Sequence, residues 1–137
     1  RFVSQLAELP PSMLAKFTLI DYDREMALVA VKQERTVDEE GEVQVTERLL
    51  GVSRYVTNPD RTTCEFALVV ADDMAGQGLG ARLMLSIMEV ARDKGLEHIE
   101  GLVLTNNPNM LKLMRRLDFE IRSFPEDPEF RLVVHKL

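Results

Sequence analysis

The chain has 137 residues, of which 45% are hydrophobic, and a formal net charge of −6 at pH 7. This length suits one compact domain, so residues 1–137 are predicted to form a single domain. The acidic balance argues against a nucleic-acid partner. No apolar run approaches the roughly 18 residues needed to span a bilayer, and the first residues lack a signal-peptide core. We therefore expect a cytoplasmic protein without a membrane partner.

Metal and disulfide chemistry are also disfavoured by the composition. Cys64 is the only cysteine, so the chain cannot form an internal disulfide or a cysteine metal cluster. The two histidines lie far apart in the sequence and do not have the spacing of zinc ligands. No metal is expected.

Three β-branched and apolar runs, at residues 26–33, 43–56 and 64–71, predict consecutive strands of an antiparallel meander. The connection between the first two runs holds five carboxylates around Gly41, namely Glu34, Asp38, Glu39, Glu40 and Glu42. This connection is either a solvated turn or a surface that attracts a basic substrate.

The second half of the chain alternates between helical and strand patterns. Apolar residues at helical spacing from Leu79 to Ala91 predict a helix that packs on the sheet and ends near Gly95. Residues 97–105 form a predicted strand, residues 107–117 a shorter helix, and residues 119–123 and 129–135 two further strands. This order predicts a mixed α/β fold (α+β in some schemes), with a mostly antiparallel sheet flanked by helices and a parallel part around the strand-helix-strand unit.

A glycine-rich junction, VVADDMAGQGLGARLM at residues 69–84, connects the third strand to the first helix. Unpaired N–H groups at a helix N-terminus and the positive end of the helix dipole favour a phosphate or pyrophosphate ligand. The alternative is a tight turn whose glycines only permit positive φ, although one or two glycines would be enough for that. Because Gly76, Gly78 and Gly80 all occur here, an anion site is predicted.

Three phosphate-loop patterns can be compared with this junction. A P-loop is excluded because Gly80 is followed by Ala81 and Arg82 instead of Lys and Ser or Thr. A dinucleotide fingerprint matches formally, but it should follow its strand directly and open a series of parallel βαβ units. The third pattern is Q/R-x-x-G-x-G/A, the acyl-coenzyme A loop of the GCN5-related N-acetyltransferase (GNAT) superfamily, and AGQGLG at residues 75–80 resembles it closely.

Other segments extend this resemblance over most of the chain. NPNMLKLMRRLDFE, at residues 107–120, looks like the superfamily signature N-x-x-x-x-x-L-Y-x-K-x-G-F. FALVVADDMAGQGLGARLM, preceded by SRYVTNPDRTTCE, is most similar to the acetyltransferase domain of bacterial Pat-type protein lysine acetyltransferases. The resemblance implies acetyl transfer from acetyl-CoA to an amine, with a protein lysine, for example on an acyl-CoA synthetase, as acceptor. It also implies that the family's first strand and most of its first helix are missing before RFVSQ, so a fragment of a longer multidomain protein is expected.

Three positions depart from the family pattern. Ala75 stands where the loop usually begins with Gln or Arg, and Asp118 replaces the glycine before Phe119. Met114 occupies the position of a tyrosine that protonates the departing thiolate in many members. Because the backbone amides of the loop remain, coenzyme binding is still expected, whereas a tyrosine general acid is not.

Glu65 is the candidate general base. A lysine side chain has a reference pKa near 10.4, so its amine must lose a proton before it can attack a thioester. Strand alternation places Glu65 on one face with Ala67 and Val69, opposite Cys64. A solvated position or an ion pair with an arginine is the alternative, but the Pat resemblance, in which a glutamate at this strand position is the proposed base, favours catalysis. Burial should then raise its pKa, or a water should relay the proton.

The resemblance also implies which residues bind the donor. If the strand splays near Val69, Val70 and Ala71, its N–H groups can hold the pantetheine arm and the oxyanion. The pyrophosphate would lie on the amides of the glycine loop and the first helical turn, which belong to Gly76, Gln77, Gly78, Leu79, Gly80 and Ala81. Asn107 is either a contact for the coenzyme or a plain helix N-cap before Pro108.

Direct transfer in a ternary complex is predicted. Cys64 should point away from Glu65 and has no adjacent histidine, which disfavours an acyl-enzyme. Two other functions remain open. A small-molecule amine acetyltransferase would use the same donor site with a deep, closed acceptor pocket, and a non-catalytic module would only sense acyl-CoA.

Overall fold

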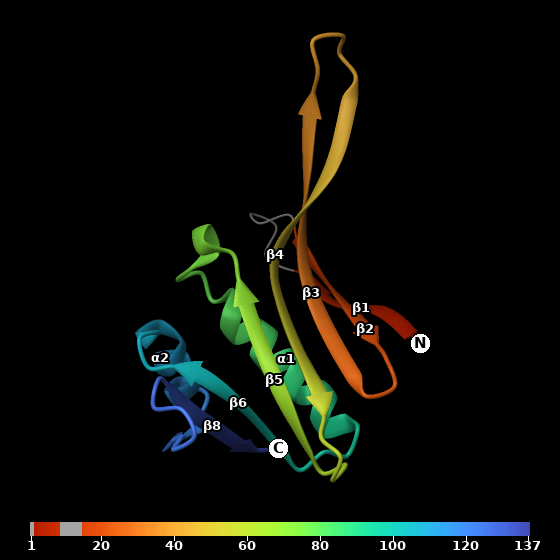
Figure 1. Cartoon of the computed structure of the whole chain (residues 1–137). Helices are drawn as coiled ribbons and strands as arrows, with labels where there is room; N and C mark the ends of the chain where they lie inside the picture. Colours follow the sequence, from red (N-terminus) through yellow and green to blue (C-terminus); the bar gives the residue numbers. More distant parts are fainter. Residues whose placement is uncertain (1, 9–14) are drawn as a thin grey trace.

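Eight strands form one sheet in the part of the chain that the structure, a computed structural model, describes: residues 2–8 and 15–137 (Figure 1). The order across the sheet is β1-β2-β3-β4-β5-β6-β8-β7. In chain order the strands are β1 (Phe2–Glu8), β2 (Ala15–Asp21), β3 (Glu25–Val37), β4 (Val43–Thr57), β5 (Thr63–Val70), β6 (His98–Leu104), β7 (Glu120–Ser123) and β8 (Phe130–Lys136). The helices are α1 (Leu79–Asp93) and α2 (Pro108–Arg116), and a short 3-10 turn, η2 (Asp72–Met74), precedes α1.

The pairing directions confirm the predicted fold class. β5 pairs in parallel with β6, and the other neighbouring pairs in the described sheet are antiparallel. β3, β4 and β5 form the predicted meander, and α1 is the crossover between the parallel strands. Neither β1 nor β2 is among the elements expected from the sequence. Within the described ranges, no helix is both long and apolar enough to cross a membrane.

Both helices pack on the same face of the sheet. The Ser53 hydroxyl on β4 donates to the Leu83 carbonyl of α1 at 2.9 Å. Phe66 on β5, which shares this face, meets Phe119 just after α2 with ring centroids 5.7 Å apart. Gly101 on β6 makes room for Phe66, since a Cβ at that position would lie 2.6 Å from the ring. The core therefore lies between one sheet face and the two helices.

The other face of the sheet carries Glu65. Ala67 and Val69 share this face, and all three side chains are exposed, while Cys64 and Phe66 point into the core. The predicted alternation along β5 is therefore confirmed. Within residues 17–137, this face is left without a covering helix.

The outer part of the β3–β4 hairpin projects from the sheet as a two-stranded ribbon, visible at the top of Figure 1. We call residues 33–49 the arm. Strand β2 pairs with β3 only as far as Lys32, and β5 pairs with β4 only from Gly51, so both edges of the arm lack a neighbouring strand in the described sheet. The arm ends in a turn in which the Asp38 carboxylate accepts the N–H groups of Glu40 and Glu42 at 3.0 and 2.8 Å.

The arm corrects the sequence analysis at one point. Residues 34–37 were predicted to belong to a connection, but they continue β3. The ladder includes Arg35↔Val45 and Val37↔Val43, so cross-strand pairing extends the strand through a stretch with loop-like, acidic composition. The true connection is only residues 38–42.

Candidate active site

β5 and β6 separate shortly after they meet. Their parallel register covers Thr63↔His98, Cys64↔Ile99 and Glu65↔Glu100. Beyond Glu65, β5 continues to Val70 while paired with β4 alone, and Figure 1 shows β5 and β6 running apart. This divergence leaves one edge of β5 open toward the gap.

One hydrogen bond shows which N–H groups of β5 face this open edge. The N–H of Ala71 donates to the Leu50 carbonyl on the β4 side at 2.8 Å. Alternate residues of a strand direct their N–H groups to opposite edges, so the N–H groups of Val70 and Leu68 face the gap. The expectation that Ala71 offers a free amide is therefore wrong, because β4 already uses it. Val69 directs its N–H toward β4 as well, and the residue borders the gap.

The glycine loop leaves a series of backbone amides available. Within the described part of the chain, no hydrogen bond joins the N–H groups of residues 76–81 to a protein acceptor. Helix α1 starts at Leu79 with Gly78 as N-cap, and its first main-chain bond runs from the Arg82 N–H to the Gly78 carbonyl at 3.1 Å. These amides and the positive end of the helix dipole form a site suited to an anion.

The three glycines of the loop have two different roles. Gly76 and Gly78 have φ of 78° and 80°, a conformation that side-chain-bearing residues rarely adopt. Gly80 lies instead where α1 meets α2, and a Cβ there would be 3.4 Å from Leu113. A tight turn that needs glycine only for positive φ, the alternative to an anion site, would therefore explain Gly76 and Gly78 but not Gly80.

A cleft of about 800 Å³ opens beside the loop. Every donor-site residue predicted from the sequence lines it: Val69, Val70, Ala71, Gly76, Gln77, Gly78, Leu79, Gly80, Ala81 and Asn107. Residues of α2 that the sequence analysis missed form the opposite wall, among them Asn109, Lys112 and Arg116. Their helical spacing after Asn107 was the available signal. The charged side chains of the cleft are Lys112, Arg116 and Asp72, so the cleft is net positive in a chain of net charge −6.

Asn107 is the N-cap of α2, because its side chain accepts the Met110 N–H at 3.2 Å. It also lines the cleft, so its capping role is compatible with a contact to a ligand. Met114, at the family's tyrosine position, is fully buried in the core. The family's general acid is thus absent from this position in both the sequence and the structure.

An ion pair connects the arm to the glycine loop. Arg48 of the arm binds the carboxylate of Asp73 in η2, and this hydrogen bond lowers the pKa of Asp73. The Asp73 carbonyl in turn accepts the Gln77 side-chain amide at 3.3 Å. The base of the arm is therefore fixed beside the cleft.

Glu65 lies in the last parallel pair before the strands separate, next to Glu100. Its side chain is exposed and does not line the cleft. Of the two expectations for a basic Glu65, burial is not found, because the described chain places no helix over its face, and the relay through a water stays a prediction. Cys64 points to the opposite face, as predicted, and its burial raises the pKa of the thiol to about 12. An unreactive buried thiol agrees with transfer that does not pass through an acyl-enzyme.

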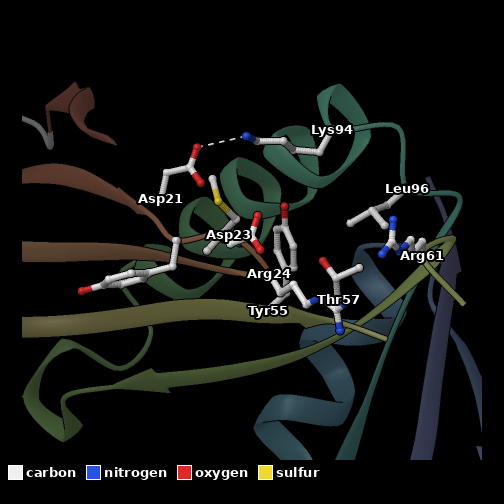
Figure 2. A pocket seen from close by; sticks show the side chains of 10 residues that line it. Asp21, Asp23, Arg24, Tyr55, Thr57, Arg61, Lys94 and Leu96 are labelled. Carbon is white, nitrogen blue, oxygen red and sulfur yellow. Dashed lines mark hydrogen bonds and ion pairs between the residues drawn. The ribbon is translucent and has the colours of Figure 1, made fainter. Parts of the chain in front are cut away.

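A second pocket, of about 280 Å³, lies at the other end of α1 and shares no lining residue with the cleft (Figure 2). An ion pair between Asp21 and Lys94, 3.0 Å apart, borders it. Figure 2 shows the Tyr55 hydroxyl pointing toward the side of the pocket where this pair lies. Burial of the Tyr55 ring raises the pKa of its phenol well above the ordinary value.

The mixed sheet and the diverging parallel pair together define an acetyltransferase fold, with an amide-lined cleft at the gap between the strands. The model of the Acetyltransferase (GNAT) family matches residues 7–119. The chain belongs to this family of acetyl-CoA-dependent N-acetyltransferases.

Individual relatives agree with this assignment. Acetyltransferase PA5475 of Pseudomonas aeruginosa is 34% identical over 137 residues, which is 100% of this chain and 68% of that protein. An L-methionine sulfoximine/L-methionine sulfone acetyltransferase of Pseudomonas paraeruginosa is 39% identical over 61 residues, covering 44% of this chain and 36% of that protein. The solved GNAT domain of S. lividans PAT superposes with a TM-score of 0.66 at 23% identity, over 85% of this chain and 64% of that one, which supports the fold. The closer relationship to Pat-type enzymes stays a prediction.

Proposed function

We propose that the protein transfers the acetyl group of acetyl-CoA directly to the ε-amino group of a lysine in another protein, with Glu65 as general base. The observation that carries this proposal is the position of Glu65. It stands where β5 and β6 part, on a sheet face that lacks a helix in the described chain. A bulky acceptor can approach this face, while the donor cleft opens farther along the same strand.

The donor would be held mainly by the backbone. The amides of residues 76–81 suit the pyrophosphate of the coenzyme, and Lys112 and Arg116 add positive charge for its phosphates. The amides of Val70 and Leu68 suit the pantetheine arm and the thioester oxygen. From Leu68 to Glu65 is three residues, about 10 Å at the rise of a strand, so donor and base share one element.

The chemistry requires two protons to leave the lysine nitrogen, one of them to the protein. The protonated lysine loses a proton to the Glu65 carboxylate, directly or through a water, and the neutral nitrogen attacks the thioester carbonyl. The amides at the strand edge stabilise the oxyanion of the tetrahedral intermediate. The C–S bond then breaks, and the extra proton of the attacking nitrogen passes through solvent to the coenzyme thiolate, because Met114 has no proton to donate.

A small amine is the second candidate acceptor. It is favoured by the relative from Pseudomonas paraeruginosa, whose name states that it acetylates L-methionine sulfoximine and L-methionine sulfone. The open surroundings of Glu65 favour a polypeptide over such a ligand, because a small amine is better bound by a closed pocket.

The test is an acceptor panel. The chain is incubated with labelled acetyl-CoA and, in parallel, with an acyl-CoA synthetase, a lysine-containing peptide and L-methionine sulfoximine. Label on a defined lysine, located by peptide mapping, supports the proposal. Transfer only to the small amine assigns the second candidate. Binding of acetyl-CoA without transfer to any amine would show a module that senses acyl-CoA, and it would overturn the enzymatic proposal for this chain.

A further inference from the structure

The arm is a ribbon without lateral support. Five cross-strand pairs, from Gln33↔Glu47 to Val37↔Val43, lie beyond the reach of β2 and β5. A two-stranded ribbon on its own is only marginally stable in water. Figure 1 shows the arm extending away from the helices and the other strands. We therefore expect the arm to be stabilised by a partner that the described chain does not supply.

One face of the arm carries an apolar stripe, with Gln33, Arg35 and Glu47 beside it on the same face. It consists of Val37, Val43, Val45 and Leu49, whose side chains are between 54% and 68% exposed. The register places them on one side, because directly opposed residues of a ladder share a face. Four exposed aliphatic side chains on one side of a narrow ribbon form a surface that gains free energy when it is covered.

The stripe continues the sheet face that carries Glu65. Leu49 lies opposite Val31, two residues from Val29 on the same strand. Val29 pairs with Val52, and Val52 pairs with Val69 on β5, the strand of Glu65. A polypeptide lying on the stripe is therefore on the side from which an acceptor would reach Glu65.

The charge of the arm indicates the kind of polypeptide. The arm carries six carboxylates and two arginines, a net charge of −4 within a chain of net charge −6. In the described part of the chain, none of these carboxylates forms an ion pair, and Arg48 is engaged by Asp73 outside the arm. A ribbon of net charge −4 with an apolar stripe is complementary to a basic segment with interspersed apolar side chains.

We propose that the arm is the docking element for the acceptor, and that the acceptor is a basic polypeptide segment. This inference rests on the proposed function, since it specifies the substrate class of the same enzyme. The apolar side chains of the acceptor cover the stripe, while its lysines and arginines meet the carboxylates near the tip. The Arg48–Asp73 ion pair holds the base of the arm at the glycine loop and keeps the bound segment close to the donor.

Two arm variants test this proposal. Glu39→Gln/Glu40→Gln/Glu42→Gln removes charge at the tip and retains Asp38, which holds the turn together. Val43→Thr/Val45→Thr makes the stripe polar while keeping β-branched residues. Gln44→Thr, on the opposite face of the arm, is the matched control. Thermal unfolding shows that each variant is folded before it is assayed.

The acceptors are a labelled peptide of alternating lysine and valine and, for comparison, Nα-acetyl-lysine amide. Both arm variants should raise KM for the peptide about tenfold at low salt and leave KM for the small amine and for acetyl-CoA unchanged. An unchanged KM for the peptide, or an equal rise for both acceptors, would overturn the proposal.

Peptide binding measured by fluorescence anisotropy separates this inference from the proposed function. If the chain acetylates no amine but the arm variants still weaken peptide binding, the proposed function fails while the docking role stands. If the variants change only the mass of the protein in sedimentation, the stripe is covered by a second copy of the chain, and the docking proposal is wrong.

Discussion

Glu65 and Glu100 lie side by side in the last parallel pair of β5 and β6, just before the two strands separate. Both belong to the sheet face opposite the helices, and Glu65 is the more exposed of the two. In the proposed reaction, these two carboxylates at the inner end of the gap are the candidates for the group that accepts the proton of the amine. This pair therefore allows the general base to be assigned by experiment.

Glu65→Gln should lower kcat by about 10²–10⁴, the usual contribution of a general base, with little change in KM for acetyl-CoA. Glu100→Gln removes the neighbouring carboxylate on the same sheet face and should lower kcat less than about tenfold. Steady-state kinetics with a lysine-containing acceptor measures both. A larger loss in Glu100→Gln would move the role of base to Glu100.

Gly78→Ala should weaken acetyl-CoA binding about tenfold. The residue has φ of 80° and open space around it, so the cost is backbone strain of about 1–2 kcal/mol, which distorts the amides of the loop. Gly95→Ala, with φ of 85° and equally open surroundings at the far end of α1, is the matched control. Calorimetric titration should show lost affinity for Gly78→Ala only, while thermal unfolding shows similar destabilisation for both. Equal affinities would contradict the assignment of the loop as donor site.

Lys112→Ala and Arg116→Ala should each weaken acetyl-CoA binding about threefold to tenfold, and the loss should shrink as salt is added. Both side chains line the cleft. Arg115 is an exposed residue of the same helix that does not line the cleft. The Arg115→Ala variant should therefore bind acetyl-CoA with the affinity of the unchanged protein. The same affinity for all variants would mean that α2 does not contact the coenzyme.

The Cys64 thiol should not react with Ellman's reagent at pH 8 while the protein is folded, because burial raises its pKa to about 12. A raised pKa in the folded state means that the contribution to stability is complete below pH 9 and is lost as the pH rises toward 12. Tyr55 acts in the same direction, since burial also raises the pKa of its phenol. Chemical denaturation between pH 8 and 11 should show falling stability, with a smaller slope in Cys64→Ala. A fast reaction of the native thiol would contradict its burial.

Much of the fold could be predicted because its signals are local. The alternation of Cys64, Glu65 and Phe66 set the two faces of β5, and the helical spacing after Gly80 set the buried side of α1. Gly76 and Gly78 marked the loop because positive φ is a property of single residues. Nine of the ten predicted donor-site residues line the cleft because strand end, loop and helix start are consecutive in the chain, whereas Asn107 comes from the start of α2.

The remaining features depend on contacts between distant segments. Residues 34–37 look like a connection until β4 pairs with them. Lys112 and Arg116 reach the cleft because Met114, on another side of α2, packs into the core. The use of the Ala71 amide by Leu50, and the exposure of Glu65, likewise depend on which strands and helices lie alongside β5.

The sequence by itself determined the order of the elements from β3 onward, the phosphate-type loop and the face on which each β5 side chain lies, because periodicity and backbone preference act over a few residues. Only the tertiary structure decided where β5 and β6 part, which amides stay available and how far the arm extends, because hydrogen bonds and packing between segments remote in sequence satisfy some groups and leave others open.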